Sequence, residues 1–246
     1  MTLEGPLDVE GGVMRKMAQV FAVFALLVAF SPRAEASPIL VSADATVAGG
    51  LFAGVNFGDD DGRGGLLSGR DGSAIFGPYR FYLMFALPLF APETVISAAT
   101  LQGFYNDDWD TFDDRTHSFY QAPTNWTEST ITWNNQPGST GGPLAVFDAR
   151  QATPGTFQSW DVTSTVNTAY LQQMLLFSLL FRADNEALGV APVINNNLEY
   201  FASREFLSGA RAFRLDVEVA AVPEPGALLL ATGLAGVVWL RRRRGR

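Results

Sequence analysis

The chain has 246 residues with 17 basic and 25 acidic side chains, and its formal net charge at pH 7 is −8. Residues 37–225 alone hold nine arginines, no lysine and twenty-one acidic residues, a net charge of −12 when all are ionised, and such a field repels nucleic acid and other polyanions. The absence of cysteine excludes thiol catalysis and thiolate metal sites, and the single histidine, His117, excludes histidine-rich metal sites.

The first 36 residues have the features of a secretory signal peptide. Two basic residues precede a short uncharged run, and the small residues Ala34 and Ala36 then mark a cleavage site before Ser37. An acidic stretch lies ahead of the basic residues, which predicts that translation starts at Met14. About 185 residues remain between this segment and the chain's apolar end, enough for one domain with its own core.

Residues 37–220 are predicted to form an all-β domain. Segments rich in Val, Ile, Phe, Tyr and Thr lie between Gly, Pro, Asn and Asp clusters, and helical periodicity is weak. Roughly eight strands with long connections favour a jelly-roll-like antiparallel β-sandwich. The predicted strands are 39–47, 79–86, 95–105, 117–122, 158–161, 175–182, 198–203 and 212–219, and a short helix is predicted at 162–174, capped by Asp161 or Ser164.

The last predicted strand has the clearest alternation of the chain. Leu215 and Val217 fall on one face, whereas Arg214, Asp216 and Glu218 fall on the other. This pattern predicts that one face of the strand is buried and that the other is wet.

The segment 126–135 is a candidate sugar-binding site. Trp126 and Trp133 flank hydroxyl groups and the carboxylate of Glu128, and such a set can stack a sugar ring and hydrogen-bond its hydroxyls. Trp109 is a further candidate of the same kind. In the alternative interpretation, the two indoles fill the sandwich core and Glu128 satisfies backbone groups of a turn.

Calcium is the one cofactor for which the sequence offers candidate ligands. Carboxylates beside glycines let the backbone fold around a hard cation, although the full spacing of an EF-hand loop is missing. An ordinary solvated turn explains the same residues. The candidate ligands are Asp44, Asp59, Asp60, Asp61 and Asp71.

No pattern in the chain sets a catalytic acid apart from a base, and no nucleophile motif is present. We therefore expect a protein that is not an enzyme. Arg204 and Glu205 are predicted to form an ion pair, with Asp161 and Arg80 as further candidate partners.

Residues 222–246 combine an apolar run with a proline boundary and an arginine cluster. The run 226–240 is free of charge and, as a helix, would cover about 22 Å of a hydrocarbon layer about 30 Å thick. These features resemble the PEP-CTERM sorting signal of Gram-negative bacteria. The residues that carry the resemblance are Pro223, Glu224, Pro225, Arg241, Arg242, Arg243 and Arg244.

That resemblance implies export, anchoring in the inner membrane through the C-terminal helix, and processing by an exosortase. The expected destination is the outer surface of the cell envelope or the extracellular matrix. The arginines also favour the cytoplasmic side of a membrane, which places the rest of the chain outside the cytoplasm.

A second resemblance covers nearly the whole of residues 37–220. The strings 43–47, 79–85, 125–137, 160–163 and 201–205 are similar in order and spacing to the DNRLRE domain family. The family resemblance implies an extracellular jelly-roll module related to carbohydrate-binding modules. The expected function is therefore non-catalytic polysaccharide binding, and the alternatives are a structural or adhesive envelope protein without a small ligand, or a polysaccharide lyase or hydrolase.

Overall fold

Within residues 37–58, 65–70, 76–90, 94–108, 116–186 and 198–220, the parts of the chain that the computed structural model describes, ten strands pair antiparallel throughout. These residues belong to the compact unit Glu35–Val222. All eight predicted strands are present, so the all-β expectation is confirmed. The elements are β1 (Ile39–Gly50), β2 (Gly65–Ser68), β3 (Phe76–Ala86), β4 (Ile96–Asp108), β5 (Thr116–Ala122), β6 (Thr140–Asp148), β7 (Thr156–Asp161), helix α2 (Thr163–Leu171), β8 (Leu176–Ala183), β9 (Glu199–Ala202), the 3-10 turn η2 (Phe206–Gly209) and β10 (Arg214–Val219).

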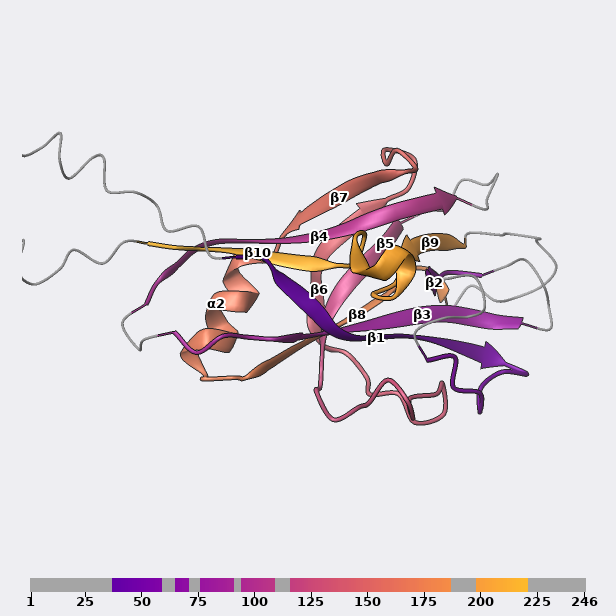
Figure 1. Ribbon diagram of the computed structural model, residues 1–246. Helices are drawn as coiled ribbons and strands as arrows, with labels where there is room; N and C mark the ends of the chain where they lie inside the picture. The colour runs from indigo at the N-terminus through magenta and orange to yellow at the C-terminus, as the bar shows by residue number, and fades with distance from the viewer. Residues whose placement is uncertain are drawn as a thin grey trace, which may run out of the picture. The chain divides into compact units, whose positions relative to one another are not determined.

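The strands form two layers joined through β1 (Figure 1). Ile39 and Leu40 pair with β10, whereas the rest of β1 pairs with β3. Sheet A contains β10, β4, β9 and β2, with β7 on the second edge of β4, and sheet B runs β1-β3-β8-β5-β6. A strand that changes sheets in this way closes the sandwich at one corner.

The main core lies between the two sheets and is dominated by aromatic rings. Phe81 of β3 stacks on Phe181 of β8 with ring centroids 4.7 Å apart and also meets Phe213, which enters from the sheet A side. These rings are fully buried. Gly103 of β4 leaves room for this packing, since a Cβ there would lie 2.2 Å from the Phe213 ring.

A second apolar cluster covers the outer face of sheet B. The alternate residues of β1 and β3, such as Val47 and Tyr82, point away from the main core and pack with Trp126 and Ile131 from the segment 123–139. Both faces of β3 are therefore buried, which explains why its sequence is apolar at nearly every position.

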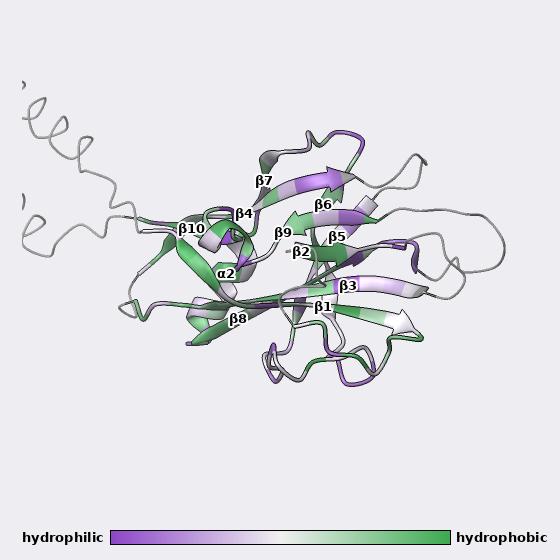
Figure 2. Cartoon of the chain, turned by 45° about the vertical axis from the view of Figure 1, so that its right-hand side comes forward, coloured by the Kyte–Doolittle hydropathy of each residue, from purple (hydrophilic) through white to green (hydrophobic). Residues whose placement is uncertain are grey.

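Strand β10 confirms its predicted alternation. Leu215 and Val217 are buried in the main core, whereas Arg214, Asp216 and Glu218 are half-buried on the outer face of sheet A. In Figure 2, hydrophobic residues run along much of β8, and hydrophilic residues occupy the end of β4.

Two strands, β2 and β6, were not predicted, because glycine and proline dominate the sequence around them. Both occupy ends of the strand order. Gly65 is required at the start of β2, since a Cβ there would lie 2.3 Å from the Tyr200 ring. β6 contains Gly141, Gly142 and Pro143 and is largely exposed, as is usual for edge strands.

Helix α2 confirms the predicted helix, shortened at its end. Asp161 accepts a hydrogen bond from the Thr163 N–H at 2.9 Å, although Val162 occupies the N-cap position itself. Val166 is buried and Tyr170 and Met174 pack against the core from one face. In the described part of the chain no helix is long and apolar enough to cross a membrane, and the run 226–240 lies outside that part.

Candidate functional site

Trp126 lies in the second apolar cluster, not on the surface. Its side chain is 7% exposed, and its ring centroid is 5.7 Å from that of Tyr82. The indole Nε1 donates a hydrogen bond to Ser178 Oγ at 2.9 Å. A ring buried to this extent cannot stack a sugar, so the structure favours the core interpretation for this residue.

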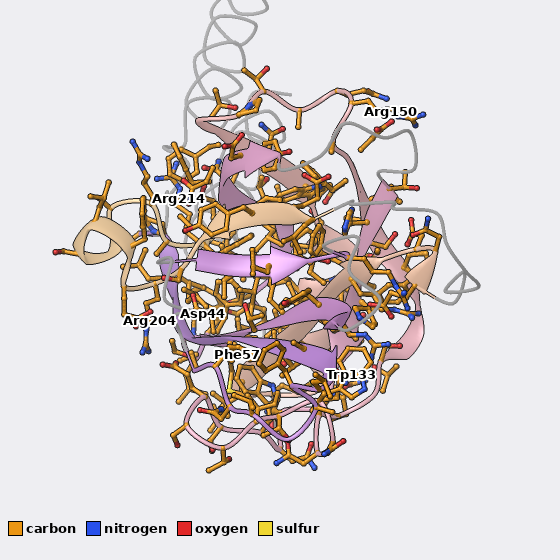
Figure 3. The ribbon with its side chains drawn as sticks, turned by 90° about the vertical axis from the view of Figure 1, so that its right-hand side faces the viewer. Asp44, Phe57, Trp133, Arg150, Arg204 and Arg214 are labelled. Atoms are coloured by element: carbon orange, nitrogen blue, oxygen red, sulfur yellow. The ribbon has the colours of Figure 1, made fainter. Side chains whose placement is uncertain are left out.

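Glu128 and Arg204 cover the edge of β1 that faces away from β3, beyond the point where its pairing with β10 ends. Glu128 Oε2 accepts the backbone N–H of Asp44 at 3.3 Å, and Arg204 Nη1 donates to the carbonyl oxygen of Ser42. Arg204 Nη2 binds Glu128 Oε1 at 3.0 Å, and Figure 3 shows Arg204 beside Asp44. Side chains that occupy free backbone groups in this way protect a strand edge from pairing with another chain.

The predicted ion pair between Arg204 and Glu205 is confirmed, with Nε 2.5 Å from Oε1. The two further candidate partners, Asp161 and Arg80, were wrong for this pair. Asp161 instead holds the start of α2, and Arg80 binds Glu186. Arg204 also pairs with Glu128, and Arg80 pairs with Glu186, across 76 and 106 residues, so spacing alone did not indicate these two partners.

Asp44 is a buried carboxyl group at the centre of this cluster. Its side chain is fully buried, and Oδ2 accepts the Arg204 N–H at 2.8 Å. Oδ1 has no hydrogen-bond partner among the described residues. Burial removes water from the charged form and raises the pKa of Asp44 to about 8, an effect that the Arg204 N–H opposes and that Glu205 and Glu128 reinforce.

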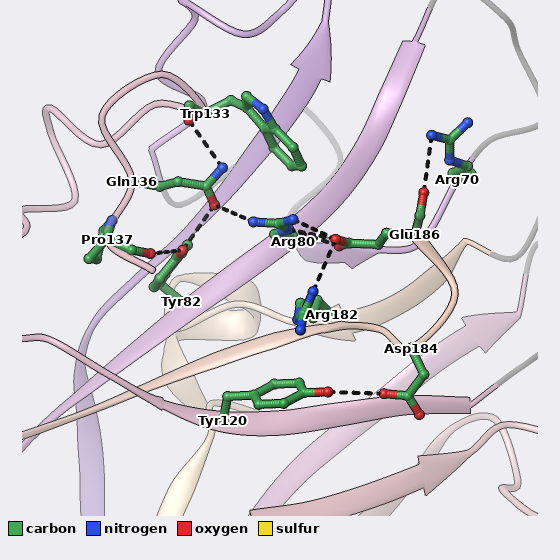
Figure 4. Close-up of polar contacts among 10 residues, drawn as sticks. All are labelled: Arg70, Arg80, Tyr82, Tyr120, Trp133, Gln136, Pro137, Arg182, Asp184 and Glu186. Carbon is green, nitrogen blue, oxygen red and sulfur yellow. Dashed lines mark hydrogen bonds and ion pairs between the residues drawn. The ribbon is translucent and has the colours of Figure 1, made fainter. Parts of the chain in front are cut away.

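Trp133 belongs to a network on the outer side of sheet B (Figure 4). The Arg80 guanidinium of β3 lies 4.3 Å from the centroid of the half-buried Trp133 ring. Arg80 also binds Glu186, with Nε 2.8 Å from Oε1 and Nη2 2.5 Å from Oε2. Gln136 receives hydrogen bonds from Arg80 Nη1 and from the Tyr82 hydroxyl, and so joins the tryptophan segment to the sheet.

A second arginine extends the network along the sheet. Arg182 of β8 lies 3.7 Å from Glu186 Oε2, and its guanidinium is 4.6 Å from the centroid of the Tyr120 ring. The Tyr120 hydroxyl points to Asp184 at 3.4 Å. We call Arg80, Tyr120, Trp133, Gln136, Arg182 and Glu186 the sheet B network.

The sheet B network offers the chemistry of sugar recognition. Aromatic faces and guanidinium donors stand side by side, and the Arg80 and Arg182 side chains keep 20% and 31% of their surface exposed. Aromatic rings can stack on the apolar face of a sugar while charged donors hydrogen-bond its hydroxyls. Of these residues, the sequence indicated only Trp133 as a candidate, because Arg80 and Arg182 fall in ordinary strand patterns.

Most of the remaining predicted ligands lie outside the part of the chain that the structure describes. Trp109, Asp59, Asp60, Asp61 and Asp71 lie outside the described residues, as do Ala34, Ala36 and the C-terminal motif. Residues 37–58, 65–70, 76–90, 94–108, 116–186 and 198–220 contain no group of three acidic, histidine or cysteine side chains arranged to hold a metal ion. The Ca²⁺ interpretation therefore stays a prediction.

Replacing Glu186 with alanine is expected to lower the free energy of unfolding by about 2–3 kcal/mol, because two guanidiniums lose their shared carboxylate. We expect a smaller loss than for breaking a fully buried ion pair, since both arginines are partly exposed. The matched control is Asp148→Ala, which breaks a pair whose Arg150 side chain is 54% exposed and should cost less than about 1 kcal/mol. Urea unfolding of both variants measures the difference, and equal losses would contradict this account.

Comparisons with known protein families agree with both resemblances drawn from the sequence. The family model of carbohydrate-binding module family 96 matches residues 35–193. The PEP-CTERM protein-sorting motif matches residues 221–244. No curated protein matches the chain.

Proposed function

Because the chain belongs to carbohydrate-binding module family 96, we propose that its β-sandwich binds polysaccharide without catalysis and that the sheet B network is the binding surface. The observation that carries this proposal is the half-buried Trp133 ring, which lies beside the partly exposed guanidinium of Arg80 in a network that also holds Arg182. Membership in a family of carbohydrate-binding modules implies binding rather than bond cleavage. Glu128 and Glu205 both form ion pairs with Arg204, which gives these carboxylates a structural role.

Affinity electrophoresis on a panel of neutral and acidic polysaccharides tests the binding surface. Trp133→Ala is expected to weaken retention at least about tenfold, since a central aromatic contact contributes about 2 kcal/mol or more to such an interface. The control is Phe157→Ala, which removes an exposed aromatic ring from the outer face of sheet A and should leave retention unchanged.

The opposite pattern, with retention lost in Phe157→Ala and kept in Trp133→Ala, would move the binding surface to sheet A. Repeating the measurement with a chelator tests the predicted calcium ligands. If no polysaccharide retains the pure protein while a deletion strain loses extracellular matrix, the structural or adhesive role replaces binding. Release of reducing sugars or unsaturated products would establish a hydrolase or lyase.

We also propose that the C-terminal segment delivers this module to the outside of the cell. The PEP-CTERM motif at 221–244 implies a secreted protein sorted to the cell envelope. We propose that its apolar run anchors the precursor in the inner membrane of a Gram-negative cell until an exosortase processes it near Pro223-Glu224-Pro225. The mass of the mature C-terminus from cells tests this proposal, and an intact Arg246 on the exported protein would contradict it.

A further inference from the structure

One end of the sandwich exposes a group of leucines. Leu89 follows β3 and is 83% exposed, Leu171 ends α2 and is 74% exposed, and Leu175 and Leu176 at the start of β8 are 57% and 38% exposed. We call these four residues the leucine end. Apolar side chains are common singly on protein surfaces, but a contiguous group indicates an interaction surface.

Contacts between three chain segments bring together the parts of the chain that carry these leucines. The ring of Phe90, next to Leu89, lies 4.7 Å from the ring of Tyr170, next to Leu171. The Leu87 N–H donates to the carbonyl oxygen of Leu175 at 2.9 Å. The loop after β3, the end of α2 and the start of β8 therefore meet at one place.

Charge is missing from the two stretches of chain that carry the four leucines. Residues 81–92 and 162–181 contain no Asp, Glu, Lys or Arg, although residues 37–225 as a whole carry a net charge of −12. An acidic domain is repelled by an anionic membrane surface, and the repulsion is smallest where its own charges are furthest away. The leucine end is therefore suited to face lipid.

The chain also leaves the domain on this side. The last described residue, Ala220, donates its N–H to the carbonyl oxygen of Val95 at 2.9 Å, and Val95 lies in the same β3–β4 connection as Leu89. In Figure 1 the end of β10 lies on the same side of the domain as α2. Only residues 221–225 separate Ala220 from the uncharged run 226–240, and five residues span at most about 20 Å.

We propose that the leucine end rests on the lipid bilayer while the C-terminal run is inserted, so that the domain stands on the membrane in one orientation before processing. This inference rests on the proposed membrane insertion of the run 226–240. A tether of about 20 Å brings the domain end to the head groups, and the four leucines then enter the interfacial region, where apolar side chains are favoured. In this orientation the sheet B network is held away from the bilayer, because the Arg80–Arg182 pair lies six residues along β3 and β8 from the Ala86–Leu176 pair at the leucine end.

The natural absence of cysteine allows a direct test with the full chain. Single variants Leu89→Cys, Leu171→Cys, Val55→Cys and Ala231→Cys are labelled with the environment-sensitive dye NBD and placed, one chain per disc, in nanodiscs of phosphatidylethanolamine and phosphatidylglycerol. Val55 is the matched control, because it is an apolar residue that is 41% exposed. It follows the C-terminal end of β1, at the other end of the sandwich from the leucine end. The measured quantity is the rate at which dithionite reduces the dye.

The expected result is reduction several-fold slower at positions 89 and 171 than at position 55, with position 231 fully protected. Equal rates at 89, 171 and 55, with 231 protected, overturn this inference and leave the membrane insertion intact. An unprotected position 231 would show that the run 226–240 is not inserted. That result overturns both the proposed membrane anchoring and this inference. Protection at 89 and 171 that appears only with two chains per disc assigns the leucine end to a second copy of the chain and also overturns the inference.

Discussion

Asp44→Asn is expected to remove a loss of stability that the natural protein suffers as the pH rises from about 4 to about 8. The folded state holds the Asp44 proton up to a pKa of about 8, against 3.8 in the unfolded chain. The folded state therefore binds more protons between these values, and the free energy of unfolding must fall as the pH rises through that window. The stabilisation by this group is complete below pH 4 and is lost above pH 8.

The size of the effect follows from the shift. Each pKa unit corresponds to about 1.4 kcal/mol, so the difference between the natural protein and Asp44→Asn should change by up to about 5 kcal/mol between pH 4 and pH 8. The asparagine keeps an oxygen to accept the Arg204 N–H and carries no charge to desolvate. Urea unfolding of both proteins at one-unit pH intervals measures the difference directly.

Asp148→Asn serves as the control with the opposite sign. Hydrogen bonds from Arg150 lower the pKa of Asp148 to about 2, so its stabilisation is present above pH 4 and is lost as the pH falls through 2. The stability difference between this variant and the natural protein should be constant from pH 4 to pH 8. If the Asp44→Asn difference is equally constant over that window, Asp44 is ionised in the fold and the account of its burial is wrong.

Trp126→Ala is expected to lower the free energy of unfolding by about 3–5 kcal/mol, the usual loss when a large aromatic side chain is deleted from a packed interior. The variant leaves a cavity beside Tyr82 and removes the donor to Ser178 Oγ. Denaturant unfolding followed by the remaining tryptophans measures the loss. At temperatures where the variant is folded, its retention on polysaccharide should match that of the natural protein.

Two further variants separate packing from hydrogen bonding at this position. Trp126→Phe should recover most of the lost stability, because it refills the cavity, whereas Ser178→Ala should lower stability by about 1 kcal/mol. A Trp126→Ala protein of unchanged stability that no longer binds polysaccharide would show that the indole is a ligand contact after all.

The local patterns of the chain were enough to predict most of the fold. Alternation in β10 and the apolar stretches of β3 and β8 define strands by themselves, because side chains on a strand point to opposite faces in turn. Glycine and proline hid β2 and β6, whose pairing depends on neighbours and not on their own propensity. At Gly65, for example, the backbone of β2 lies so close to the Tyr200 ring of β9 that only glycine fits there.

The functional residues divide in the same way. The C-terminal sorting motif, matched at 221–244, and the alternating strands are local patterns. The sequence by itself therefore determined the all-β class, this sorting motif and the aromatic segment around Trp126 and Trp133. Only the tertiary structure decided that Trp126 is buried while Trp133 lies beside Arg80. In an irregular segment, residues a few positions apart can face in different directions. The tertiary structure also brought the Arg204 backbone N–H to Asp44, 160 residues away, and Glu186 to Arg80, 106 residues away. Polar and charged groups that are removed from water are stabilised by whichever partners the folded chain brings near.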